Sequence, residues 1–265
     1  ERAATRLADC TVRMQRFLAA EEALLEEKAG CFSTTDLEAV NRGLVLVRDL
    51  VWGLSHDVLG NVQRIVELAG ARGVADVAAE ALPKYRKLNT LLNCLDRLEV
   101  RGRDSAGIEI SFVPADAGAS DDLLSGVRRK GFDAELRRRT AAGDPVNGSI
   151  TIAPQAAPRA KGARSVAFIY KTASIIGELG RNVRELRACI GQDCLFADFA
   201  RLPVVYEAAV AHTRWASVGS ITEENCHPVD NFSPSPAATA REGDGRPVYG
   251  GGSWSIRVAL NGDVD

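Results

Sequence analysis

The chain has 265 residues, of which 46% are hydrophobic, so it is long enough for one large domain or two smaller ones with a real core. Its 33 Lys and Arg residues nearly balance its 35 Asp and Glu residues, for a net charge of -2. Nucleic-acid-binding and membrane-surface proteins normally carry a strong basic excess, so neither partner is expected. No run of 18 apolar residues occurs, so no membrane span is predicted.

The cysteines and histidines do not form a metal-binding pattern. None of the six cysteines belongs to a CxxC pair, and the closest two, Cys189 and Cys194, have the wrong spacing for a zinc knuckle. Cys226 and His227 are adjacent, which is awkward for chelating one tetrahedral ion. We therefore predict no metal and no cofactor, and we interpret the cysteines as reduced thiols of a cytoplasmic protein.

Helical patterns fill the first hundred residues. Apolar residues fall on one helical face over residues 7–25, and Gly30 offers a stop. A capping box of Thr35 and Glu38 is predicted to open the next helix, whose apolar residues repeat at spacings of three and four until Gly60 closes it.

Three further helical patterns complete this part of the chain. Residues 62–68 and, more weakly, 74–82 are followed by a leucine-rich pattern over residues 88–98. We predict a helical segment over residues 1–97, packed as a bundle against the next module. The pattern alone does not distinguish such a bundle from a protein-interaction or dimer surface.

The pattern changes at Gly107, where alternating residues predict a half-buried strand over residues 108–112. Residues 114–162 are poor in aliphatic side chains, and we interpret them as a surface insertion with one short strand at 150–152. The basic run Arg137-Arg138-Arg139 inside it is predicted to lie on a solvated helix face.

The remaining chain alternates between strands, helices and long loops. A buried strand is predicted at residues 165–170 and a helix at 176–190, with extended segments at 204–206, 209–215 and 254–260. Asn261-Gly262 then turns the chain sharply. These elements predict an α+β domain over residues 98–265, behind the helical segment.

Arg214 stands beside Trp215 and a run of short polar residues. A guanidinium held between an aromatic ring and hydroxyl groups is well suited to binding a small carboxylate through two parallel hydrogen bonds. Most Arg-Trp neighbours only pack a side-chain stem on a ring, so this pair alone is weak evidence of a site.

Three segments in order resemble the class II glutamine amidotransferases, in particular the glutaminase domain of the hexosamine-forming aminotransferases. LEVRGRDSAGIEI at residues 98–110 resembles that family's LEYRGYDSAG segment. HTRWASVGSITEENCHP at 212–228 resembles HTRWATHGxPSxxNAHP, and VALNGD at 258–263 resembles VVHNGI.

The resemblance implies a glutamine pocket. In the family, the thiol of an N-terminal Cys attacks the side-chain amide of glutamine. By resemblance, Arg214 binds the α-carboxylate of glutamine, with Trp215 and Ser217 shaping the pocket. The side-chain amide of Asn261 and the N–H of Gly262 form the oxyanion hole.

Four further positions match the family motifs around this pocket. Arg101 and Asp104 belong to the motif beside the nucleophile and are expected to support it. His212 and His227 also match family positions, where a structural hydrogen bond is the expected role.

The resemblance also implies a fold and a reaction. The fold is the layered α/β/β/α arrangement of the N-terminal-nucleophile hydrolases, here incomplete and preceded by an elaborated helical segment. Glutamine is hydrolysed to glutamate, and ammonia passes to a sugar phosphate, fructose 6-phosphate to glucosamine 6-phosphate. A sugar isomerase domain outside this chain would perform that second step, within a homo-oligomer. Asparagine synthetase-like and phosphoribosyl amidotransferase-like enzymes share the first step, but HTRWA with RGxDSAG fits the hexosamine branch best.

The chain departs from the family at several positions. Residue 1 is Glu rather than the nucleophilic Cys, Arg103 replaces the usual Tyr, and Val218 replaces the usual His. The nucleophile is therefore expected upstream of Glu1, and the chain by itself is expected to be inactive. The alternative is a non-catalytic, amidotransferase-like domain that binds glutamine or serves as a scaffold.

Overall fold

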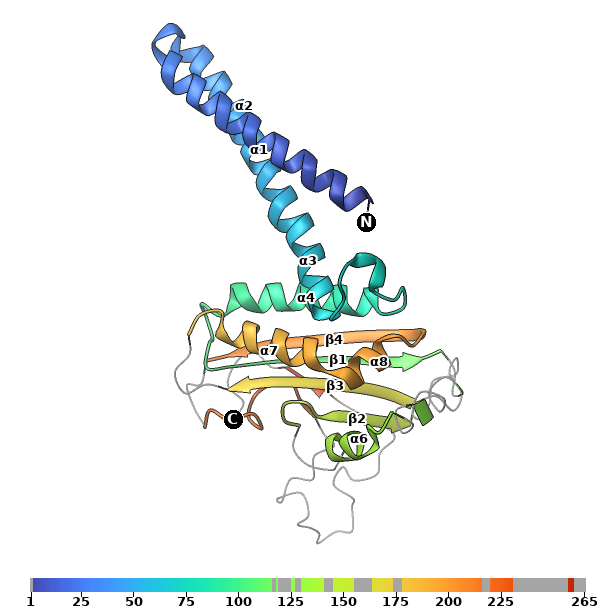
Figure 1. Ribbon diagram of the computed structural model, residues 1–265. Helices are drawn as coiled ribbons and strands as arrows, with labels where there is room; N and C mark the ends of the chain where they lie inside the picture. Colours follow the sequence, from blue (N-terminus) through green and yellow to red (C-terminus); the bar gives the residue numbers. More distant parts are fainter. Residues whose placement is uncertain are drawn as a thin grey trace. The chain divides into compact units, whose positions relative to one another are not determined.

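The computed structural model describes residues 2–115, 118, 125–126, 130–140, 145–154, 164–173, 178–215, 220–230 and 257–259 (Figure 1). The chain divides into two compact units. One comprises Glu1–Glu67 and Ala71–Val77 and is helical, and the other comprises Leu68–Gly70 and Ala78–Asp265 and carries the sheet. The chain is therefore an α+β protein, as predicted.

The first unit is built on a helical hairpin. Helix α1 (Arg2–Lys28) and helix α2 (Thr34–Trp52) pack side by side, joined by the short 3-10 helix η1 (Ala29–Cys31) (Figure 1). Both helices were predicted, but the predicted capping box is wrong. Ser33 is the N-cap of α2, and its Oγ accepts a hydrogen bond of 3.2 Å from the Asp36 N–H. Thr35 lies inside the first turn.

The predicted helix end at Gly60 is also wrong. After α2 the chain continues through the π-helical segment η2 (Gly53–Leu59) into helix α3 (Gly60–Leu68). Gly60 itself has helical angles, with φ -61° and ψ -40°, and its N–H donates to the Ser55 carbonyl. A glycine ends a helix only where the backbone turns left-handed, and nothing in the sequence required that turn here. The weak pattern over 74–82 forms only the 3-10 helix η3 (Val74–Asp76).

The second unit contains a four-stranded antiparallel sheet in the order β2-β3-β1-β4. Its strands are β1 (Ser105–Pro114), β2 (Ile150–Pro154), β3 (Arg164–Ala173) and β4 (Val204–Arg214). Strand β1 is hydrogen-bonded on both sides, to β3 and to β4. It is buried on both faces, so the predicted half-buried strand is wrong: Glu109, expected on the open face, is only 3% exposed.

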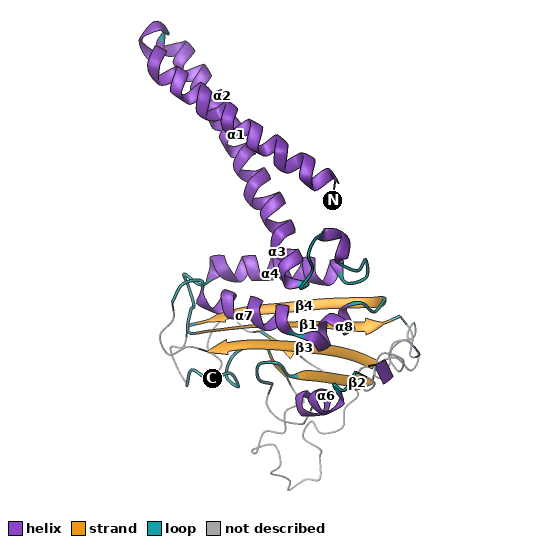
Figure 2. Cartoon of the chain, viewed as in Figure 1, coloured by secondary structure: helices purple, strands orange, loops and turns teal. Residues whose placement is uncertain are grey.

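Helices α4 (Leu82–Leu98), α7 (Arg181–Gln192) and α8 (Cys194–Ala200) cover one face of the sheet (Figure 2). An aromatic core fills the space between them, where Phe196 of α8 contacts Phe168 of β3 and Tyr85 of α4 edge-to-face, at 5.2 and 5.5 Å between ring centroids. By packing, α4 belongs with the sheet, although it lies within the predicted helical segment 1–97. The predicted domain boundary between residues 97 and 98 stays a prediction.

Helix α7 takes its N-terminal cap from a distant residue. The carboxylate of Glu99 accepts hydrogen bonds from the Gly180 and Val183 N–H groups, the latter at 3.1 Å. The Asn182 side chain in turn donates to the Arg103 carbonyl at 2.9 Å. The start of α7 therefore holds the loop between α4 and β1, which carries the RGRD residues.

The remaining sequence predictions agree with the structure in part. Strand β3 and helix α4 were predicted. The predicted extended segments 204–206 and 209–215 are one strand, β4, and of the segment predicted at 254–260 the described residues include β6 (Arg257–Val258). Helix α7 begins at Arg181, so Leu179 precedes it and is exposed, whereas Ile176 lies outside the described residues. Helix α6 (Asp133–Arg139) and β2 lie within the predicted insertion. Helix α8 was not predicted.

Candidate functional site

Two of the three motif segments lie directly beside each other. In the sheet, Ser105 of β1 pairs with Arg214 of β4, and the Asp104 N–H donates to the Arg214 carbonyl at 3.1 Å. The backbones touch at Gly102, where a Cβ would lie 2.9 Å from the Arg214 carbonyl carbon and 3.0 Å from the Trp215 nitrogen. Only a residue without a side chain fits this contact, so RGRDSAG and HTRW form one packed unit.

The NCHP residues close over the same strand. Gly107 of β1 pairs with His212 of β4, and a Cβ on Gly107 would lie 2.0 Å from the His227 carbonyl oxygen. The rings of His212 and His227 contact each other, with centroids 4.8 Å apart and planes tilted by 50°. The two histidines are thus brought together, and the structural hydrogen bond expected for each stays a prediction.

The third motif segment begins beside the second. Strand β5 (Val229–Asp230), directly after His227-Pro228, pairs antiparallel with β6 (Arg257–Val258), with Val229 opposite Val258. The described chain ends at Ala259, so the predicted oxyanion residues Asn261 and Gly262 lie outside the described residues, as does Ser217. The pairing nevertheless brings the start of VALNGD to the end of the second motif.

Arg214 lies at the last position of β4, where the strand gives way to the second motif's loop. Its guanidinium donates to the Ser220 carbonyl at 3.1 Å, and the Asn225 side chain donates to the same carbonyl at 3.3 Å. These bonds fix the guanidinium between β4 and residues 220–225. Trp215 is 68% exposed, so its ring is open to solvent or to a ligand.

Arg101 and Asp104 frame the entry to β1. The Arg101 N–H donates to the Leu98 carbonyl at 2.8 Å, which closes a turn at the end of α4, and the side chain is exposed. Asp104 is tied to Arg214 through its backbone. The Asp104 bond holds the loop against β4, and the supporting role that the resemblance implies for both residues stays a prediction.

Sequence reasoning missed Cys226, which is fully buried beside β1. Burial raises the pKa of its thiol, and the nearby positive charge of Lys171 lowers it by less. A buried thiol with a raised pKa is a poor nucleophile, so Cys226 is not suited to act as one. The sequence showed a Cys beside the motif histidine, and the strand packing shows that its role is in the core.

The described residues contain no group of three or more His, Cys, Asp or Glu side chains that could hold a metal ion. All six cysteines are free thiols. Among the helices of the described residues, none is long and apolar enough to cross a membrane.

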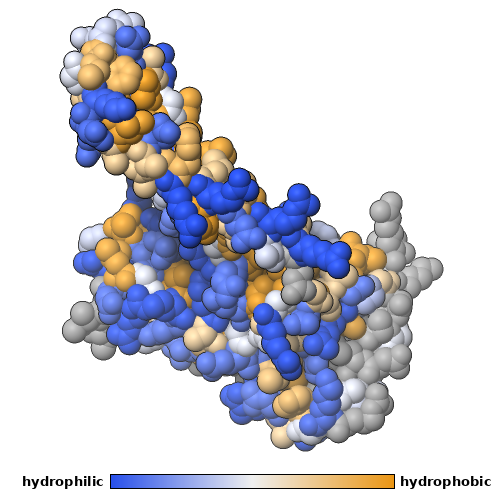
Figure 3. All heavy atoms as spheres, turned by 45° about the horizontal axis from the view of Figure 1, so that its top comes forward, coloured by the Kyte–Doolittle hydropathy of each residue, from blue (hydrophilic) through white to orange (hydrophobic). Residues whose placement is uncertain are grey.

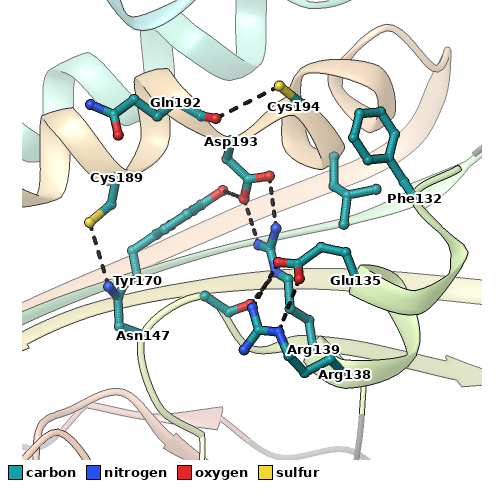
Figure 4. Close-up of a pocket in the computed structure, with 12 residues that line it drawn as sticks. Phe132, Glu135, Arg138, Arg139, Asn147, Tyr170, Cys189, Gln192, Asp193 and Cys194 are labelled. Atoms are coloured by element: carbon teal, nitrogen blue, oxygen red, sulfur yellow. Dashed lines mark hydrogen bonds and ion pairs between the residues drawn. The ribbon is translucent and has the colours of Figure 1, made fainter. Parts of the chain in front are cut away.

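A cavity of about 370 Å³ lies between α6, β3 and the α7–α8 corner (Figure 4). On its floor Arg139 makes a two-pronged ion pair with Asp193, at 2.8 and 2.5 Å, and Tyr170 donates to Asp193 at 2.7 Å. On its rim Arg138 pairs with Glu135 at 2.7 Å. These charged groups bind one another, so we assign the cluster a stabilising role.

This cluster corrects the prediction for the triple-Arg run. Arg137 and Arg138 pair with acidic residues of their own helix and are exposed, as predicted for a solvated face. Arg139 instead has only 7% of its side chain exposed and crosses to Asp193, which also caps α8 through the Phe196 N–H. The sequence could not show this ion pair because Arg139 and Asp193 are 54 residues apart and come together only in the folded domain.

Replacing Asp193 by Asn is expected to lower the free energy of unfolding by about 3 kcal/mol, since it leaves Arg139 buried without its partner charge. Burial by itself raises the pKa of Asp193, but the hydrogen bonds from Arg139, Phe196 and Tyr170 outweigh it and hold that pKa below its ordinary value. The stabilisation is therefore present above about pH 4 and is lost as the pH falls through the lowered pKa.

Urea unfolding at several pH values measures both effects. The control is Asp198→Asn on the same helix, whose partner Lys130 is exposed and whose loss is expected to cost at most about 1 kcal/mol. Equal losses for the two variants would contradict the stabilising role of the Asp193 cluster.

Comparison of the chain with protein-family models, with curated proteins and with solved structures finds no match.

Proposed function

We propose that residues 98–265 form the glutamine-binding part of a class II glutaminase domain. In the proposed reaction, a Cys thiol upstream of Glu1 attacks the side-chain amide carbon of glutamine, and the C–N bond breaks to release ammonia. Water then hydrolyses the thioester to glutamate and regenerates the thiol. Both steps pass through a tetrahedral oxyanion, which requires preorganised donors.

One observation supports the proposal: of three segments from distant parts of the chain, singled out by motif alone, the first two pack together along β1 and the third begins beside the end of the second. Ser105 pairs with Arg214, Gly107 contacts His227, and Val229 pairs with Val258. If the three motif segments resembled the family only by chance, there would be no reason for their glycines to lie at backbone contacts between the segments. Proximity is what a shared substrate pocket needs.

Each residue has a role in this proposal. Arg214, fixed by Ser220 at the end of β4, binds the α-carboxylate of glutamine as a bidentate donor. Trp215 and Ser217 line the pocket, and Asn261 with Gly262 supply the oxyanion hole. Arg101, Asp104 and His212 hold these segments in register.

The finer fold and the second half-reaction belong to the same proposal. A sheet covered on one face by helices is one half of the α/β/β/α arrangement of N-terminal-nucleophile hydrolases, and β5 and β6 would belong to the second sheet. Ammonia would pass to a sugar phosphate, fructose 6-phosphate by the hexosamine resemblance, on an isomerase domain. The protein would act as a cytoplasmic homo-oligomer.

The test is glutamine hydrolysis by the full-length protein that carries this chain. We expect glutamate release in a coupled assay and stoichiometric labelling of a Cys upstream of Glu1 by a diazoketone analogue of glutamine. Asparagine, one methylene shorter, serves as the control substrate and is expected to be a poor one, because its amide cannot reach the nucleophile while Arg214 holds its carboxylate.

Two other outcomes would separate the alternatives. Glutamine binding by calorimetry without glutamate release would overturn the enzyme and support a glutamine-binding domain without catalysis. The absence of both binding and hydrolysis would overturn the glutamine pocket altogether.

A further inference from the structure

The hairpin of α1 and α2 leaves large apolar side chains in solvent. The two helices bury little more than Leu18, Leu44 and Val51 in their own seam. In contrast, Phe17 is 55% exposed, Leu46 is 65% exposed and Leu50 is 54% exposed. In Figure 3, apolar residues show at the surface of this hairpin among the charged ones.

The exposed apolar residues form a stripe on each helix. On α2 the stripe follows spacings of four, three and four, and on α1 it follows spacings of three and four. This is the spacing of a coiled-coil seam. The α2 stripe consists of Ala39, Gly43, Leu46 and Leu50. The α1 stripe consists of Cys10, Phe17, Ala20 and Leu24, with the charged Arg13 at one position between them.

The two stripes open onto one face of the hairpin. At 3.6 residues per turn, each stripe lies about 100° round its helix from the buried seam, in the same rotational sense. Because α1 and α2 run antiparallel, the same rotation about each helix axis, viewed along its own chain direction, places both stripes on the same side of the hairpin. We call this surface, lined by the two stripes, the hairpin face.

Charge is segregated along α1. The stretch from residue 2 to residue 16 carries Arg2, Arg6, Arg13 and Arg16 against one acidic residue, Asp9. The stretch from residue 17 to residue 28 carries Glu21, Glu22, Glu26 and Glu27 against one basic residue, Lys28. Such a helix is complementary to an antiparallel copy of itself, because each basic half then meets an acidic half.

We propose that the hairpin face binds the hairpin face of a second copy of this chain, forming a four-helix bundle across a two-fold axis. The axis passes near Phe17, so that α1 crosses its counterpart antiparallel and Arg13 lies near Glu21 of the second copy. Leu46 and Leu50 then pack against the same stripe of the other chain. This proposal does not depend on the glutaminase proposal.

The area available is of the order that a stable dimer needs. Helix α2 spans about 28 Å, and two packed helices present a face roughly 20 Å wide. The flat area of this face is therefore about 600 Å², and the accessible surface is larger because the side chains make the face uneven. Standard interfaces bury about 800 Å² per partner. An anionic membrane is a poor alternative occupant, because the acidic half of α1 would be repelled by it.

The first test replaces both Leu46 and Leu50 by Glu in the 265-residue chain. Sedimentation equilibrium of the unaltered chain is expected to give a mass near twice 28.3 kDa at micromolar concentration. The double variant is expected to raise the dimer Kd by about 100-fold or more, since it places four charges in the apolar centre of the interface. The matched control is Val45→Glu, an exposed position on the opposite side of α2, which is expected to leave the Kd unchanged.

The second test addresses the antiparallel pairing of α1. Arg13→Glu alone and Glu21→Arg alone are each expected to raise the Kd about fivefold or more, because each sets like charges opposite each other. The combined variant Arg13→Glu with Glu21→Arg restores opposite charges across the axis and is expected to restore the Kd. Circular dichroism monitors helix content in every variant.

Three results would overturn the proposal. A chain that sediments as a monomer up to high micromolar concentration has no such interface. Equal effects of Leu46→Glu with Leu50→Glu and of Val45→Glu would place the contact elsewhere. Failure of the combined charge reversal to restore the dimer would exclude the antiparallel α1 pairing.

Discussion

Replacing Asn261 by Ala in the full-length protein is expected to lower kcat for glutamine hydrolysis by about a hundredfold or more, with a small change in KM. The reason is that an oxyanion-hole donor acts on the charge that develops in the transition state and not on the bound amide. Loss of one such donor costs roughly a hundredfold to a thousandfold in kcat. Initial rates of glutamate release over a range of glutamine concentrations measure both constants.

The control for this variant is Asn41→Ala, an exposed asparagine on α2. It is expected to keep both constants unchanged, which separates the loss of an oxyanion donor from a general effect of the substitution. A kcat within a few-fold of the unaltered enzyme would remove Asn261 from the oxyanion hole.

Replacing Arg214 by Ala is expected to raise the KM for glutamine about 10- to 100-fold. The substitution removes hydrogen bonds to a charged carboxylate, each worth about 1.5 to 3 kcal/mol. These bonds are made in the ground state and kept in the transition state, so kcat is expected to fall much less than kcat/KM. Steady-state kinetics of glutamate release again provide the measurement.

Two further variants sharpen this test. Arg214→Lys keeps the positive charge but loses the bidentate geometry, so its KM is expected to lie between those of the unaltered enzyme and the Ala variant. Arg86→Ala removes an exposed guanidinium from α4 and is expected to change neither constant. If Arg214→Ala binds glutamine normally, the carboxylate role is wrong.

Local patterns were sufficient to predict the longest helices and the existence of the central strands. The apolar spacing of α2 and the run SVAFIY in β3 reflect burial of one helical face and of one strand, and both are visible within a few residues. Periodicity failed where burial depends on distant partners. Glu109 alternates with apolar residues as an exposed position would, but β1 is covered on both faces by the rest of the unit.

Most of the other errors arise at single residues whose type is compatible with two different structural roles. Gly60 could end a helix or continue one, and the choice depends on the backbone angle, which the sequence does not specify. Arg139 is the same residue type as its neighbours Arg137 and Arg138, but its ion-pair partner Asp193 follows β3 in the chain. No local pattern distinguishes the buried Arg from its exposed neighbours.

The candidate site was predicted from motifs and not from periodicity. The sequence indicated Arg214 and the RGRDSAG segment, and it explained why an enzyme would use them. It did not indicate that Gly102 and Gly107 are the points where the segments touch, nor that Cys226 lies buried beside Gly107. Those facts depend on the pairing of β1 with β4.

The position of β1 at the centre of the sheet has a consequence for how the domain folds. Its pairing with β4 joins residues about a hundred positions apart, and its pairing with β3 closes a loop of roughly sixty, so both are contacts of high sequence separation that form slowly. Ser105 and Arg214 can meet only when these long loops have closed. Folding intermediates that contain only the helices would lack the contacts between the motif segments. Ligand binding between these segments would therefore become possible only late in folding, once the sheet is complete.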